Sequence, residues 1–248
     1  MADPLHQFQI RPWIDLSVAG TDVSFTNSAA AMSAAVIIAT IGLTFGMRHR
    51  ATFPGRWQAA AEMIYEFIAS MVREHIGPEG RRYFPFVFSI FAFVLLGNLI
   101  GMAPYGFTFT SHIIVTFALA LIVVSMVTIV GFVIHGWRFL TLFMPKDVPL
   151  ILSPILVPIE IISYLSRAVS LSVRLFANMM AGHTMLKVFA GFSVSLGASM
   201  GLTGYALGLL PVTVNVLLVA FEILIALLQA YVFTILTCLY LRDAVHLH

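Results

Sequence analysis

Charged and polar side chains interrupt the long apolar run from Val148 to Leu241, and these are the residues of the chain that could do chemistry. A charge at the centre of a membrane helix costs about 2.5–3.5 kcal/mol on insertion scales, so such residues normally face a cavity or a partner. We therefore expect a function for this set, which comprises Glu160, Arg167, Arg174, Asn178, His183, Lys187, Glu222 and Gln229.

Arg174 lies on a polar face of the helix that the first part of this run predicts. At about 100° per residue, a stripe about 100° wide holds only charged, polar or small side chains. Small residues let another helix approach closely, so a second helix could sit, and move, beside Arg174. The stripe consists of Glu160, Ser163, Arg167, Ser170, Arg174, Ala177, Asn178 and Ala181.

The chemistry of an arginine limits what Arg174 can do. A guanidinium stays protonated under essentially all conditions, so it cannot carry protons by titrating. It can attract a carboxylate and favour the ionised form of that group, and its fixed charge opposes direct passage of protons. The sequence has no acid one helical turn from Arg174. The acid would have to come from elsewhere in the fold or from a partner.

His183 and Glu222 form a second candidate site. His183 lies about 180° from Arg174 around the same predicted helix. Glu222 and Gln229 are seven residues apart and share a face of the last helix. If the two helices are antiparallel neighbours, His183 and Glu222 could relay protons, or they could be a buried ion pair that fixes helix register. Asn178 and Gln229 could hold water, which favours the relay.

Other residues offer weaker signals. Glu160 could form the mouth of a cytoplasmic path or pair with Arg167, and both readings stay open. Lys187 is expected to extend to an interface, and Asn98 to hydrogen-bond between helices. No His, Cys or acidic set has metal-ligand spacing, and no nucleotide loop or catalytic triad is visible. We therefore expect no metal, no cofactor and no catalytic site in this chain.

The elements that position these residues must be membrane helices. Of the 248 residues, 60% are apolar and 10% charged, whereas a soluble domain carries about 25% charged residues. A net charge of +2 gives no reason to expect a nucleic-acid partner. The apolar runs are far longer than a barrel strand of about 10 residues. The fold class is therefore all-α, a polytopic membrane protein whose residues 1–248 form a single domain in contact with lipid.

Charge-free runs and turn signals predict five crossings and one amphipathic helix. The last two helices would be roughly 60 and 55 Å long. Because the hydrocarbon core is about 30 Å thick, we expect them to form a strongly tilted intramembrane hairpin. The amphipathic helix either lies on the cytoplasmic membrane face or packs against a partner's soluble stalk. The segments are an outer N-terminal segment (1–22), helix 23–47, the amphipathic helix 57–77, helices 83–103 and 111–137, and the tilted helices 148–194 and 205–242.

The basic residues predict the orientation, because Lys and Arg are favoured on the cytoplasmic side. Nine of the thirteen fall in 48–82, in 138–146 and at Arg242. Five crossings place all nine in the cytoplasm, with the N-terminus outside and the C-terminus inside. The uncharged loop 103–111 and the turn Ser195–Gly204 then fall outside.

The sequence around these residues resembles the a subunit of F-type ATP synthase, in its mitochondrion-like bacterial form. The resemblance covers nearly the whole chain and is weakest over the first 25 residues. It is carried by PIEIISYLSRAV (158–169), SLSVRLFANMMAGH (170–183), FEILIALLQAYVFTIL (221–236) and GNLIGMAPYGFTFTSHIIVTFALAL (97–121).

The resemblance implies a role in the proton path of the membrane sector. The chain would be the stator beside a rotating ring of c subunits, each with a membrane-embedded carboxylate that supplies the missing acid. Arg174 matches the essential arginine of the family. The half-channel to the outside would use Asn178, His183, Glu222 and Gln229, and the cytoplasmic side Glu160 and Ser170. In the family's best-known bacterial form the His and Glu positions are exchanged, so the order of proton transfer stays open.

The resemblance also implies partners and a location. The chain would contact the c-subunit ring and the b subunits of the peripheral stalk, and through the complex the F1 head. It would be a multi-pass protein of the bacterial inner membrane. The alternatives are a secondary transporter with a midplane anion site at Arg174, a structural anchor, and a sodium-driven form of the same machine.

Overall fold

The computed structural model of the chain describes residues 8–15, 17–18, 21–22, 24–48, 55–103, 106–143 and 153–246. Parts of several predicted segments lie outside the described residues. They include the start of the N-terminal segment (1–7), the turn residues 104–105, and 148–152, where the first tilted helix is expected to begin.

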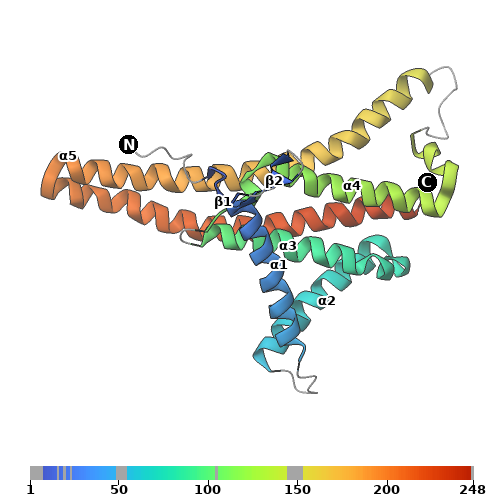
Figure 1. Cartoon of the computed structure of the whole chain (residues 1–248), viewed down its shortest axis with the longest axis horizontal. Helices are drawn as coiled ribbons and strands as arrows, with labels where there is room; N and C mark the ends of the chain where they lie inside the picture. Colours follow the sequence, from blue (N-terminus) through green and yellow to red (C-terminus); the bar gives the residue numbers. More distant parts are fainter. Residues whose placement is uncertain are drawn as a thin grey trace. The chain divides into compact units, whose positions relative to one another are not determined.

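Long helices make up most of the described chain (Figure 1). They are α1 (Asn27–Gly46), α2 (Arg56–Ile76), α3 (Phe84–Met102), α4 (Ile113–His135) and α5 (Ser153–Val245), joined by the 3-10 turns η2 (Pro78–Arg82), η3 (Phe109–Ser111) and η4 (Gly136–Phe143).

The prediction of five membrane helices is confirmed, because five stretches of the described residues are long and apolar enough to cross a bilayer. The amphipathic α2 is not among them. The five are Asn27–Gly46, Phe84–Met102, Ile113–Leu140, Pro154–Ala198 and Ala206–Val245.

Helix α5 contains the last two of these stretches, which we call its first limb (Pro154–Ala198) and its second limb (Ala206–Val245). The Ser193 hydroxyl donates to the Gly208 carbonyl at 2.9 Å, so the chain folds back between them. The predicted turn at Ser195–Gly204 keeps a helical backbone, so the reversal is a bend inside one element. Glycines at 197, 201 and 204 lower the cost of such a bend.

The described chain divides into two compact units, and each takes segments from three separate stretches of sequence. Unit 1 comprises residues 1–40, 93–112 and 175–230, and unit 2 comprises 41–92, 113–174 and 231–248. The single domain 1–248 therefore stays a prediction, as does the tilt of the last two helices.

In unit 1, the N-terminal segment adds short strands to an otherwise helical chain. Strand β1 (Pro12–Ile14) pairs antiparallel with β4 (Phe25–Thr26), and β2 (Ser17–Val18) with β3 (Thr21–Asp22). Asn27, the first residue of α1, ties this segment to the helix. Its side chain accepts from the Arg11 amide at 3.1 Å and donates to the Gln9 carbonyl at 3.0 Å.

The core of unit 1 joins the end of α3 to the middle of α5. The two limbs run side by side here and meet at the bend (Figure 1). The Asn98 amide of α3 donates to the Ala226 carbonyl of the second limb at 3.3 Å. Phe109 is fully buried in the place that a Gly97 side chain would occupy. Other buried residues are Val94, Leu175, Met179 and Ala230.

Unit 2 packs α2, α4 and the two ends of α5. Helix α2 buries Ile68, Met71, Val72 and Ile76 on one face, and it ends at Gly77, whose φ of 89° favours glycine. The Thr128 and Tyr164 hydroxyls, from α4 and the first limb, lie 2.7 Å apart. The His246 imidazole lies 3.1 Å from the Ile76 carbonyl.

Candidate functional site

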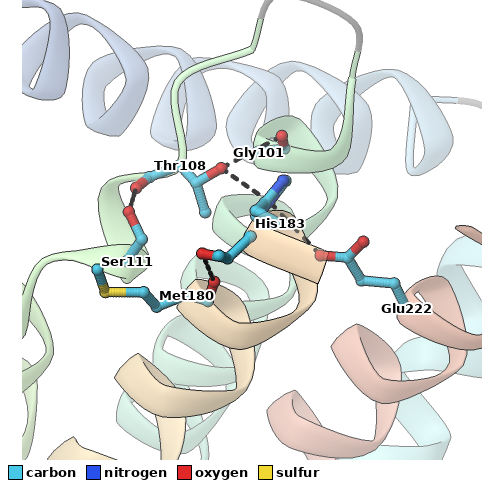
Figure 2. A network of polar contacts seen from close by, with 7 residues as sticks. Gly101, Thr108, Ser111, Met180, His183 and Glu222 are labelled. Carbon is cyan, nitrogen blue, oxygen red and sulfur yellow. Dashed lines mark hydrogen bonds and ion pairs between the residues drawn. The ribbon is translucent and has the colours of Figure 1, made fainter. Parts of the chain in front are cut away.

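The antiparallel limbs of α5 bring His183 and Glu222 together in unit 1. The His183 Nε2 atom lies 3.7 Å from Glu222 Oε1, and the two side chains are 11% and 4% exposed (Figure 2). Neither carboxylate oxygen has a hydrogen-bond partner among the described residues. The pair is thus a buried acid facing a buried imidazole, an arrangement that can pass a proton between them.

Gly182 makes room for this carboxylate. A Cβ atom on Gly182 would lie 2.5 Å from Glu222 Oε1 and 2.8 Å from its carboxyl carbon. The helix surface beside His183 must therefore be bare for the Glu222 side chain to reach the imidazole.

Thr108, from the loop after α3, contacts the same imidazole. Its Oγ1 atom lies 3.0 Å from His183 Nε2 and donates to the Gly101 carbonyl at 3.2 Å (Figure 2). Sequence reasoning missed this residue. The sequence gives little indication of its role, because threonines are common in uncharged loops.

Asn178 and Gln229 form a second contact between the limbs of unit 1. The Asn178 amide donates to Gln229 Oε1 at 2.8 Å. Gln229 is 3% exposed, and its Nε2 atom has no hydrogen-bond partner in the described part of the chain. Four of the predicted site residues thus lie in two contacts along one pair of helices.

Asn215 extends the polar face of the second limb, and sequence reasoning also missed it. It precedes Glu222 by seven residues, as Glu222 precedes Gln229, so the three share a helix face. Its Oδ1 atom is buried without a hydrogen-bond partner among the described residues. The seven-residue spacing in an apolar run is the signal that could have identified it.

A cavity of about 740 Å³ reaches His183 within unit 1. His183 is among its lining residues, and Glu222 is not. The N-terminal segment supplies part of the wall, and Lys187 lines the cavity as well. The polar and charged lining residues are Gln9, Arg11, Asn27, His183, Lys187 and Asn215.

His112 stands at the start of α4 and has a different environment. Its ring stacks on Phe107, with centroids 5.3 Å apart and an interplanar angle of 19°. Burial lowers the pKa of His112 from its ordinary value, so this imidazole is neutral near pH 7.

The other predicted site residues lie in unit 2. Arg174 and Ser170 are exposed and Glu160 is half-buried on the first limb. Arg174 has no ion pair within the described residues. Arg167 contacts Asp243 rather than Glu160, with 3.0 Å between Nη1 and Oδ2, and its guanidinium lies 5.2 Å from the Tyr240 ring centroid.

The small residues of the stripe in unit 1 lie at the surface. Ala177 and Ala181 are exposed and line a shallow apolar groove of about 520 Å³ on the first limb. Its other lining residues are Phe176, Met180, Thr184, Met185, Val188 and Phe189. A helix of another chain could approach this surface closely.

Comparison with known proteins identifies the family. The model of the family described as ATP synthase A chain matches residues 29–242. The chain is 55% identical over 244 residues to ATP synthase subunit a of Parvibaculum lavamentivorans, covering 98% of this chain and 94% of that protein. It is 53% identical over 251 residues to ATP synthase subunit a of Paramagnetospirillum magneticum, covering 100% of both. For ATP synthase subunit a of Mesorhizobium japonicum, the identity is 54%, over 98% of this chain and 96% of that protein. With a family match over most of its length, this chain belongs to the ATP synthase A chain family.

Proposed function

We propose that this chain is the stator proton-channel subunit of an F-type ATP synthase. Two offset half-channels load and unload the carboxylates of a c-subunit ring, and proton flow is thereby coupled to rotation and ATP synthesis. The observation that carries the proposal is the buried His183–Glu222 pair, whose imidazole lines a cavity that also has Arg11, Lys187 and Asn215 in its wall. The exposed Arg174 on the first limb gives independent support.

The outer half-channel begins at the cavity. His183 lines the cavity and Glu222 does not, so we assign the first proton acceptor to His183 and the second to Glu222, 3.7 Å away. Buried polar atoms are normally hydrogen-bonded, so water is expected to serve those without a protein partner. On the described part of the second limb these are Asn215 Oδ1, both Glu222 oxygens and Gln229 Nε2, which together mark a route along that limb.

Arg174 acts on the carboxylate of each passing c subunit. Its permanent charge favours the ionised carboxylate and so promotes proton release to the cytoplasmic side. A protonated site can move into lipid at low cost, whereas an ionised one cannot. The offset between the two half-channels then forces the ring to turn before a proton can leave.

The inner half-channel uses Glu160 and Ser170. Both belong to the stripe that contains Arg174, and both lie nearer than Arg174 to the start of the first limb. The basic residues at 138–146 support a cytoplasmic location for that start. The carboxylate of Glu160 is half-buried, which suits a group that collects protons leaving the ring.

The same proposal assigns partners and a location. The chain contacts the c-subunit ring and the b subunits of the peripheral stalk in the bacterial inner membrane, with the F1 head on the cytoplasmic side. Its N-terminus lies outside and its C-terminus in the cytoplasm. The names of its relatives, ATP synthase subunit a of several bacteria, support this assignment. A sodium-driven form would depend mainly on c-subunit ligands.

Replacing Arg174 with alanine tests the proposal. The variant is expected to lose proton-driven ATP synthesis to background, because nothing then favours release from the c-subunit carboxylate. ATP synthesis is measured in membrane vesicles energised by a respiratory substrate, with the amount of assembled complex measured by immunoblot. An assembled Arg174→Ala complex that makes ATP at the normal rate would overturn the assignment.

Glu222→Gln tests the outer half-channel in the same vesicles. After removal of F1, passive proton conduction is expected to fall about 100-fold, because the variant cannot exchange a proton. Normal conduction would remove Glu222 from the path. A secondary transporter would give a different result, since the purified chain alone would bind and exchange a small anion.

A further inference from the structure

The Thr108 hydroxyl can donate only one hydrogen bond, and two possible partners lie within reach of it. Oγ1 lies 3.2 Å from the Gly101 carbonyl, which can only accept, and 3.0 Å from His183 Nε2. When the hydroxyl hydrogen is on the carbonyl, the oxygen can only accept from the imidazole. The bond to His183 then requires a hydrogen on Nε2.

We propose that Thr108 is a positioning residue that holds neutral His183 in the tautomer with its hydrogen on Nε2, facing Glu222. The inference rests on the proposed function, since it assigns a role within the outer half-channel. Nε2 is also the atom that lies 3.7 Å from Glu222 Oε1. The Nε2 hydrogen bonds to Thr108, and its partial positive charge also favours the nearby carboxylate, whereas a nitrogen lone pair would repel it.

The loop fixes Thr108 in place before any proton arrives. Its carbonyl accepts from the Ser111 hydroxyl at 2.6 Å and from the Ser111 amide at 3.2 Å. A Cβ atom on Gly101 would lie 2.5 Å from Thr108 Oγ1, so the hydroxyl reaches the carbonyl across a bare helix surface. Thr108 is itself 5% exposed. Figure 2 shows this network converging on the imidazole.

This tautomer gives the relay a direction. Nδ1 of His183 has a free lone pair and can accept a proton from the cavity. Loss of the Nε2 proton to the Glu222 carboxylate then leaves a neutral carboxylic acid and a neutral imidazole with its hydrogen on Nδ1. Exchange of that hydrogen through water, from Nδ1 back to Nε2, restores the tautomer that Thr108 favours. One proton enters and one is passed on, so the charge balances at each step.

The test compares Thr108→Val, Thr108→Ser and Thr110→Val in the complete ATP synthase. Thr110 is a matched control, because it lies in the same loop, is fully buried, and its hydroxyl has no hydrogen-bond partner among the described residues. Passive proton conduction is measured in vesicles stripped of F1 and normalised to the assembled complex. We expect Thr108→Val to conduct about fivefold less, as for one lost hydrogen bond. Thr108→Ser and Thr110→Val should stay close to the unsubstituted protein.

The pH dependence of proton conduction distinguishes a role of the Thr108 hydroxyl in positioning His183 from a general effect of the substitution on packing. In Thr108→Val the imidazolium loses an acceptor, so the pH of half-maximal conduction should move to lower pH. Thr108→Ser should restore the original profile. The charged groups near His183 are unchanged in all three variants, so they cannot cause this difference. Among the described residues they are Glu222 from the second limb, and Lys187 of the first limb and Arg11 of the N-terminal segment, which line the same cavity as His183.

Normal conduction in Thr108→Val, or an equal loss in Thr108→Ser, would overturn the inference. So would an equal loss in Thr110→Val. If Thr108→Val fails to assemble, Thr108→Ala is compared with Thr108→Ser under the same criteria. Normal proton conduction in Glu222→Gln would refute the half-channel itself. If Glu222→Gln does not conduct protons and Thr108→Val conducts them normally, only the role of Thr108 is refuted.

Discussion

The Glu222 carboxyl group is buried in an environment with few hydrogen-bond donors. It is 3% exposed, its one charged or ionisable contact is the His183 imidazole, and neither oxygen is hydrogen-bonded within the described residues. A carboxylate permanently ionised in such a place would normally be surrounded by donors. The sparse environment instead suits a group that gains and loses a proton during each cycle.

Gly182→Ala is expected to disturb this group without altering its chemistry. The added methyl would lie 2.5 Å from Glu222 Oε1, so the carboxylate must move away from His183. A displacement of this kind at a proton-transfer site costs about 10- to 100-fold in rate. Passive proton conduction in vesicles stripped of F1 measures the effect.

Gly191→Ala is the matched control, because it lies on the same limb and a Cβ there would meet nothing within 4 Å. This variant should conduct normally. Equal conduction in the two variants, both fully assembled, would mean that the close approach of Gly182 and Glu222 does not matter for proton transfer.

The sequence predicts some contacts of the site and misses others for a physical reason. The helical period puts Glu222 and Gln229 on one face, and two antiparallel helices then bring His183 to Glu222. Thr108 is 75 residues from His183 and lies in a loop, so no period relates them. Asp243 is likewise 76 residues from Arg167, whereas the sequence offered Glu160 as one of two open possibilities for a partner of Arg167.

At the scale of elements, the hairpin of α5 sets the register of the two contacts between its limbs, His183–Glu222 and Asn178–Gln229. Its limbs have 45 and 40 residues, or about 68 and 60 Å at 1.5 Å per residue. A bilayer core of about 30 Å cannot hold them upright, which favours the tilted arrangement. The tilt depends on the membrane and on neighbouring subunits, so neither the sequence nor the isolated chain determines it.

A cysteine pair at Ser193 and Gly208 tests the register. A Cβ on Gly208 would lie 3.3 Å from Ser193 Oγ, close enough for a disulfide after small adjustments. Mild oxidation should therefore remove most maleimide labelling of the Ser193→Cys, Gly208→Cys double variant. ATP synthesis should stay above about half of normal, because one hydrogen bond is exchanged for a covalent link.

The single variant Ser193→Cys controls for reaction with the native Cys238, which is buried. It should keep its maleimide labelling after oxidation. Two thiols that stay reactive in the oxidised double variant would show that the limbs are paired in another register.

Helix α2 illustrates where an amphipathic pattern stops being informative. Its buried face packs in unit 2, while Glu62, Glu66 and Arg73 are exposed. Trp57 and Met63 are also exposed, at 85% and 70%. Apolar side chains at the surface suit a membrane face, and charged ones suit a protein stalk or water. Both predicted positions therefore remain compatible with this helix.

For the whole molecule, the number of membrane spans decides whether the two ends of the chain share a side of the membrane. Five crossings, one for each stretch that is long and apolar enough, would put the N-terminal segment and the C-terminal end of α5 on opposite sides of the membrane. The cavity that reaches His183 is walled in part by the N-terminal segment. The proposed outer half-channel would then open on whichever side holds the N-terminus, and the basic residues at 48–82 predict that this side is the outside.

Single cysteines at two exposed positions test this orientation. Asp15 lies in the N-terminal segment, and Glu79 lies in η2 among the basic residues between the first and second spans. A membrane-impermeant maleimide should label Asp15→Cys in intact spheroplasts and Glu79→Cys only in inverted vesicles. The unsubstituted chain controls for Cys238, which is buried and should not react from either side. Labelling of Asp15→Cys from the cytoplasmic side would reverse the orientation, and the cavity would then belong to the proton exit rather than to the proton uptake path.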